Sequence, residues 1–64
     1  MNNYGERLRI LRGSETLQAV ADAVGITRSA LCAYENENRV PKDSIKVKLA
    51  EYYNTTVQAI FFND

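Results

Sequence analysis

The segment Val24-Gly25-Ile26-Thr27 constrains this chain more than any other part of its sequence. Gly25 directly follows an apolar set with helical spacing, where glycine can take the left-handed backbone conformation that ends many helices. Thr27 can cap the start of another helix, because its hydroxyl can accept a hydrogen bond from a backbone amide of the first turn. Ile26 is a lone apolar residue that can hold the turn against a core. The segment therefore predicts two short helices joined by a tight turn.

Apolar residues on both sides of this turn recur at helical spacing. The first set is Leu17, Val20, Ala21 and Val24, with Thr16 as a candidate N-cap, and the second set is Ala30, Leu31 and Tyr34. Small side chains at Ala21 and Ala30 allow the two helices to cross closely. This arrangement, within about residues 17–36, is what a helix-turn-helix motif requires.

Three further helices are expected. Tyr4, Leu8 and Leu11 share one face of a helix over residues 3–12, which Gly13-Ser14 ends. A fourth helix begins near Asp43, after the polar loop 36–41, and a fifth begins after Thr56. Their apolar sets are Ile45, Leu49, Ala50 and Tyr53 in the fourth and Val57, Ile60 and Phe61 in the fifth.

Residues 45–49 alternate between apolar and charged and could also form a strand. A single strand would leave its backbone unpaired, so we favour a helix there. The prediction is one all-α domain of five helices over residues 1–64.

Composition excludes several kinds of site. With one cysteine and no histidine, the chain of 64 residues has neither an internal disulfide nor the usual ligands of a zinc site. We see no carboxylate dyad and expect no enzyme activity, no cofactor and no small-molecule ligand. No run approaches 18 apolar residues, and the first residues do not resemble a signal peptide, so we expect a cytoplasmic protein that does not bind membranes.

The charge balance gives a mixed indication. Eight basic and eight acidic residues give a formal net charge of zero, which argues mildly against a nucleic-acid partner. The distribution of charge matters more than its sum, because a DNA-binding surface needs only one positive face.

Two long stretches of the chain resemble a known family. Residues 4–12, Tyr-Gly-Glu-Arg-Leu-Arg-Ile-Leu-Arg, are similar to the first helix of Cro/phage-repressor-type (lambda-repressor-like) helix-turn-helix domains, and residues 20–36 are similar to their core motif. The similarity continues through Arg39-Val40-Pro41 and on to Ile60-Phe61. This resemblance implies a prokaryotic or phage regulator of transcription, associated with the nucleoid, that binds palindromic operator DNA as a homodimer and acts as a repressor.

The chain departs from the family at two places. The family has glutamine after the residue that matches Thr16, where it helps to position the DNA backbone, but this chain has Leu17 there and Gln18 one position later. Residues 13–15 are also about two residues shorter than the usual first turn. We keep Gln18 as a candidate DNA contact.

The third helix is expected to lie in the major groove with its N-terminal residues on base edges. Arg28 can bind guanine or phosphate, and Ser29 can bind phosphate or a base. Thr27 can do the same or serve only as a cap. Cys32 and Ala33 are better suited to van der Waals contact with thymine methyl groups, although Cys32 could also be a redox-sensitive thiol beside Arg28.

Residues after the third helix are expected to contact the DNA backbone. Asn36 and Arg39 match positions that touch phosphate in the family, and Lys42 could join them. The resemblance also implies that Glu35 pairs with an arginine of the first helix, with Arg12 the first choice and Arg9 the second.

Aromatic residues are concentrated near the C-terminal end. A small core can absorb Tyr53 and Phe61, which would leave Phe62 and Tyr52 for a dimer interface. Simple core packing is the alternative. The expected interface residues are Tyr52, Val57, Ile60, Phe61 and Phe62.

A second functional hypothesis belongs to another class of protein. The same scaffold could serve as a protein-interaction module, such as the antitoxin of a pair, with weak DNA reading. The zero net charge, Leu17 and Ala33 favour this hypothesis, whereas Arg28, Asn36 and Arg39 favour DNA binding.

Overall fold

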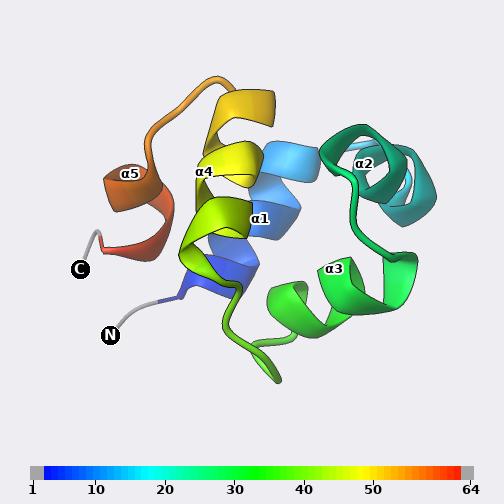
Figure 1. Cartoon of the computed structure of the whole chain (residues 1–64), viewed down its shortest axis with the longest axis horizontal. Coiled ribbons are helices and arrows are strands. Elements are labelled where there is room, and N and C mark those ends of the chain that lie inside the picture. Colours follow the sequence, from blue (N-terminus) through cyan, green and yellow to red (C-terminus); the bar gives the residue numbers. More distant parts are fainter. Residues whose placement is uncertain (1–2, 63–64) are drawn as a thin grey trace.

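Five helices account for most of the described chain. The computed structural model describes residues 3–62, and this range contains helices and loops but no strand (Figure 1). The helices are α1 (Tyr4–Arg12), α2 (Leu17–Val24), α3 (Arg28–Glu35), α4 (Asp43–Tyr52) and α5 (Val57–Phe61). The predicted all-α fold is confirmed, and residues 45–49 lie within α4. Within residues 3–62, no helix is long and apolar enough to cross a bilayer.

Local sequence signals set three of the helix starts. The hydroxyl oxygens of the threonines before α2, α3 and α5 each accept a hydrogen bond of 3.0 Å from a backbone amide in the first turn. These pairs are Thr16 with Ala19, Thr27 with Ala30, and Thr56 with Ala59. Gly25 ends α2 in the left-handed region, at φ 86° and ψ 34°. The predicted turn between α2 and α3 is therefore confirmed.

The core lies where all five helices meet. Figure 1 shows α2 and α3 on one side of α1 and α4, and α5 on the other side. Helix α1 contacts both α3 and α5, and α4 contacts both α2 and α5. The side chains buried at this junction are Leu8, Val20, Ala21, Val24, Leu31, Tyr34, Leu49, Ala50, Ile60 and Phe61. This packing leaves the outer face of α3 and the outer face of α5 on opposite sides of the molecule.

Helix α1 packs on a different stripe from the predicted one. Leu11 was expected on the inner face but is 38% exposed. Tyr4 and Leu8 do face the core, and one turn further on the stripe reaches Arg12, which is largely covered. A spacing of four residues keeps side chains in line along a short helix better than the step from Leu8 to Leu11. The inner stripe therefore ends on a charged residue.

The hydroxyl group of Tyr53 is a buried polar group. It has no hydrogen-bond partner among the described residues. Burial raises the pKa of Tyr53 to about 12, and the negative charge of Glu35 adds to this rise. Tyr53 therefore stays neutral at physiological pH and packs partly against the core, as the sequence predicted.

Candidate nucleic-acid interface

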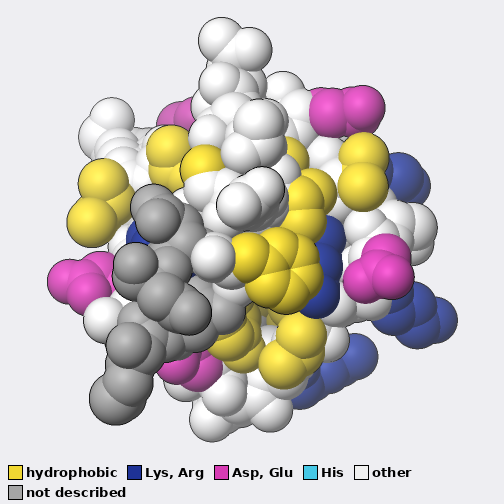
Figure 2. Space-filling model, turned by 90° about the vertical axis from the view of Figure 1, so that its left-hand side faces the viewer, with side chains coloured by type: hydrophobic (Ala, Val, Ile, Leu, Met, Phe, Trp, Pro, Cys, Tyr) yellow, Lys and Arg dark blue, Asp and Glu magenta, His cyan; other side chains and the backbone are white. Residues whose placement is uncertain are grey.

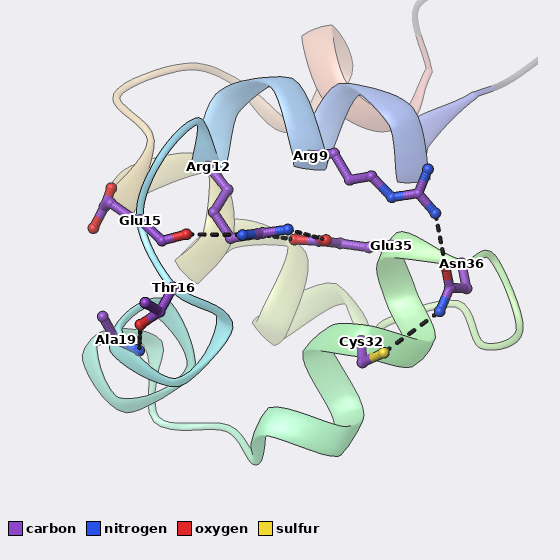
Figure 3. Close-up of polar contacts among 8 residues, drawn as sticks. All are labelled: Arg9, Arg12, Glu15, Thr16, Ala19, Cys32, Glu35 and Asn36. Atoms are coloured by element: carbon purple, nitrogen blue, oxygen red, sulfur yellow. Dashed lines mark hydrogen bonds and ion pairs between the residues drawn. The ribbon is translucent and has the colours of Figure 1, made fainter.

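An ion pair between α1 and α3 fixes the position of the helix that follows the turn. The Arg12 guanidinium donates from Nε to Glu35 Oε2 at 2.7 Å and from Nη2 to Oε1 at 3.0 Å (Figure 3). Glu35 is only 4% exposed, and the Arg12 side chain is 20% exposed. The hydrogen bond to Glu35 raises the pKa of Arg12. The predicted pairing is confirmed with Arg12, the first choice, as its partner.

The same arginine also orders the chain before α2. Arg12 Nη1 donates a hydrogen bond of 2.8 Å to the backbone oxygen of Glu15. This contact holds the short segment 13–15 against α1, directly before the N-cap Thr16 (Figure 3). One side chain thus links the end of α1, the approach to α2 and the end of α3.

A glycine allows α1 and α3 to approach closely. A Cβ atom at Gly5 would lie 2.3 Å from the backbone oxygen of Glu35. The Gly5 amide donates a hydrogen bond of 3.0 Å to Glu37 Oε2, and Glu37 adopts a left-handed backbone conformation (φ 60°). Sequence reasoning missed this contact, although a glycine inside an amphipathic helix was a signal for it because glycine weakens helices.

The outer face of α3 presents small and polar side chains around one arginine. Arg28 and Ser29 are exposed, and Cys32 and Ala33 are half-buried. Arg28 has no hydrogen bond or ion pair within residues 3–62. The Thr27 hydroxyl oxygen is engaged as the N-cap, which is the second of the two roles expected for it. Most side chains on this face are short, and Arg28 is the long cationic one. Such a face would let α3 approach a DNA groove closely.

The two residues that depart from the family pattern lie differently on α2. Leu17 packs against the core, and its aliphatic side chain has no polar group to offer a phosphate. Gln18 is exposed, and its Nε2 donates a hydrogen bond of 2.8 Å to Asp22 Oδ1 on the next turn. A contact from Gln18 to DNA would have to share this amide with Asp22.

Exposed basic residues follow α3. Arg39 and Lys42 are exposed, and the Arg39 guanidinium lies 5.9 Å from the centre of the Tyr34 ring. The Tyr4 hydroxyl donates a hydrogen bond of 2.9 Å to the Arg39 backbone oxygen, so α1 also anchors this loop. The exposed side chain of Asn36 is bound on both sides, by Arg9 and by Cys32. The structure therefore brings Arg9, which the sequence analysis named as the second choice of partner for Glu35, to the end of α3.

The residues expected at a dimer interface do not form one patch. Ile60 and Phe61 are 1% and 2% exposed, so they belong to the core of the protomer and offer almost no surface to a second copy. Phe62 is 59% exposed and lies beside Lys46, with the ammonium group 5.1 Å from the ring centre. The Tyr52 hydroxyl donates instead to the Glu15 carboxylate. Residues 46 and 52 are about 9 Å apart along α4, which separates the two exposed aromatics.

A groove between α1 and α5 was missed by the sequence analysis. Its volume is about 270 Å³, and Ile10 beside it is 71% exposed. The lining residues are Arg7, Ile10, Leu11, Thr55, Ala59 and Ile60. Hydrophobic side chains are visible on the face of the molecule that carries α5 (Figure 2). Ile10 could have been identified from the sequence as an exposed apolar residue, because it falls outside the stripe of Tyr4 and Leu8.

A comparison with protein families gives a match over most of the chain. A family model described as a helix-turn-helix domain matches residues 3–60. A comparison with curated proteins found no match. The matched range runs from the start of α1 into α5. The match therefore covers the scaffold that holds α3 as well as the turn itself.

Proposed function

Because the chain belongs to the helix-turn-helix domain family, we propose that it is a sequence-specific transcription regulator that reads the DNA major groove with α3. The observation that carries this proposal is the outer face of α3, where Arg28 and Ser29 are exposed beside the small side chains of Cys32 and Ala33. A base-reading helix needs a fixed orientation, and the bidentate pair of Arg12 with Glu35 supports that requirement. We further propose a repressor of the prokaryotic or phage type.

The proposed contacts fall into two groups. Arg28 and Ser29 meet base edges, and Cys32 and Ala33 meet thymine methyl groups. Phosphate contacts flank them on both sides of the groove and fix the register of α3 without reading sequence. The candidate phosphate ligands are Gln18, Thr27, Arg39 and Lys42. Asn36 was also expected among them, but its side chain is bound by Arg9 and Cys32.

Replacing Arg28 by alanine tests base reading. We expect a loss of about 1–3 kcal/mol on a duplex selected from a random pool and a much smaller loss on unselected duplexes, because the bidentate contact to a guanine is lost. Fluorescence anisotropy titrations at several salt concentrations measure both. Lys48→Gln, which removes one exposed cation from α4, is the matched control. Equal affinity of the parent chain for selected and random duplexes would refute specific regulation.

We also propose that two copies bind a palindromic operator. Two α3 helices related by a two-fold axis would lie about 34–36 Å apart, one turn of DNA. With Ile60 and Phe61 in the core, Phe62 remains the proposed anchor, with Val57 at its edge. Phe62 is 59% exposed, which leaves part of the residue available to a second copy beside the Lys46 ammonium group.

Phe62→Asp tests the dimer. The variant should lose about 2 kcal/mol of cooperative free energy on a palindromic duplex, since an apolar anchor becomes a charge in the contact. Sedimentation and DNA titration measure the effect. Val47→Asp is the control, because Val47 is also exposed (46%) but lies on α4. If Phe62→Asp folds and behaves as Val47→Asp does, the dimer contact lies elsewhere.

A protein-interaction module is the second candidate function. The exposed Ile10 and Leu11 beside the α1–α5 groove favour it, as does the zero net charge. This function predicts weak DNA binding by the parent chain at physiological salt, with little preference for the selected duplex. The titrations with Arg28→Ala therefore separate the two candidates.

A further inference from the structure

Helix α1 meets the C-terminal end of α3 and the loop that follows it. Arg9 of α1 donates from Nη2 to Asn36 Oδ1 at 2.7 Å, and Asn36 Nδ2 donates to Cys32 Sγ at 3.4 Å (Figure 3). Arg39, in the following loop, is held by the hydrogen bond from Tyr4 of α1 to its backbone oxygen. The end of the proposed reading helix is thus built jointly by α1, α3 and the loop after α3.

Asn36 serves as a support in this arrangement. Its carbonyl oxygen is occupied by an arginine of another helix, and its amide group is directed to a side chain one turn back on its own helix. Both ends of the side chain are therefore held, and the amide has a single orientation. A phosphate contact from Asn36 would compete with these bonds.

The Asn36 side chain holds the Arg9 guanidinium at the surface. Its side chain is exposed, and one hydrogen bond, to Asn36, engages one of the five N–H donors of its guanidinium within the described residues. The remaining donors match the oxygens of a phosphate group, which arginine binds in a fork geometry. Arg9 also lies on the side of the molecule where Arg39 follows α3.

We infer that Arg9 is a DNA-backbone contact and that Asn36 is the residue that positions it. This inference rests on the proposed function and extends the DNA-binding surface from the helix-turn-helix motif to α1. The contact reads no sequence, so it contributes equally to affinity for specific and random duplexes.

A purely structural role for Arg9 makes different predictions. A cation near the C-terminal end of a helix interacts favourably with the helix dipole, and α3 has no basic residue of its own in its last turn. If this were the whole role, removing Arg9 would lower the melting temperature and leave the salt dependence of DNA binding unchanged. The two roles are therefore separable.

Arg9→Gln is the decisive variant. The slope of log affinity against log salt should become shallower by about 0.9, and affinity at 0.15 M salt should fall about fivefold on selected and random duplexes alike, because one phosphate contact is lost. Arg9→Lys should restore the slope, since it keeps the charge. Lys48→Gln removes an equal charge from the exposed surface of α4 and should leave the slope unchanged.

Asn36→Ala, made in the parent and in Arg9→Gln, tests the positioning role. The substitution should weaken DNA binding in the parent and have little further effect once Arg9 is gone. Independent, additive losses would show that Asn36 contacts DNA by itself and would overturn its role as a support. Thermal melting of each variant confirms that it is folded.

The outcomes also separate this inference from the proposed function. If the parent binds DNA with a steep salt dependence and Arg9→Gln has the same slope, the inference about Arg9 is overturned while the proposed function stands. If the parent binds no duplex at any salt concentration, the proposed function fails, and the inference fails with it.

Discussion

Replacing Glu35 by alanine should lower the free energy of unfolding by about 3 kcal/mol, near the lower end of the range for breaking a buried ion pair from one side. Glu35 is 4% exposed and accepts both hydrogen bonds from Arg12, so its loss leaves a largely covered guanidinium without its partner. The 20% exposure of Arg12 keeps the loss from being larger. A 64-residue domain has a total stability of roughly 3–10 kcal/mol, so chemical denaturation should show a large effect.

The matched control is Glu51→Ala, which removes an exposed carboxylate from α4. Its loss of stability should be within about 0.5 kcal/mol. Removing both charges with Arg12→Met and Glu35→Leu should recover much of the stability, because no unpaired charge then remains buried. If Glu35→Ala is no less stable than Glu51→Ala, the ion pair does not hold α1 to α3.

Gly5→Ala should also destabilise the fold, by about 2 kcal/mol. The added Cβ would lie 2.3 Å from the backbone oxygen of Glu35, so α1 and α3 would have to separate. The better helix propensity of alanine offsets this cost by up to about 1 kcal/mol. Thermal and chemical unfolding measure the net change.

Two further substitutions test whether the close contact at Gly5 causes the loss of stability. Ser44→Ala, at an exposed position in the first turn of α4, introduces alanine without a steric contact and should be neutral or slightly stabilising. Gly5→Val should be worse than Gly5→Ala, because the larger side chain enters the same contact. A Gly5→Ala variant as stable as the parent would mean that α1 can move away from α3 without a loss of stability.

The sequence predicted the parts of the fold that depend on neighbouring residues. A threonine hydroxyl caps amides two or three residues away, and Gly25 ends α2 through its own backbone conformation. Both signals act within one turn, so they can be read before any tertiary contact is known. The same holds for α3 and its exposed Arg28 and Ser29, since the apolar set that faces inward defines the face that points out.

Resemblance supplied one long-range contact that local patterns could not. Arg12 and Glu35 are 23 residues apart, and neither periodicity nor capping connects them. The similarity to a known family suggested the pair with two candidate arginines, and the structure selects Arg12. Selection depended on the packing stripe of α1, which brings Arg12, one turn beyond Leu8, to the inner face.

Tertiary packing decided which apolar residues remained for other contacts. From the sequence, Phe62 was the expected interface anchor, Ile60 and Phe61 could be shared between core and interface, and Leu11 belonged to the core. In the fold, α5 inserts the first two between α1 and α4 and leaves Phe62 outside, while Leu11 and Ile10 line a surface groove. A helical repeat identifies the apolar face of a helix but not how many residues of that face are buried. The neighbouring helices decide that number.

The sequence by itself therefore determined the five helices, the turn and the exposed face of α3, because these follow from interactions over three or four residues. Only the tertiary structure decided what meets the end of α3: Gly5 against the Glu35 backbone, and Arg9 on Asn36. These contacts join residues 27 to 30 positions apart and depend on the angle at which α1 crosses α3. That angle is set by the volumes of the core side chains packed between the helices, which no local pattern encodes.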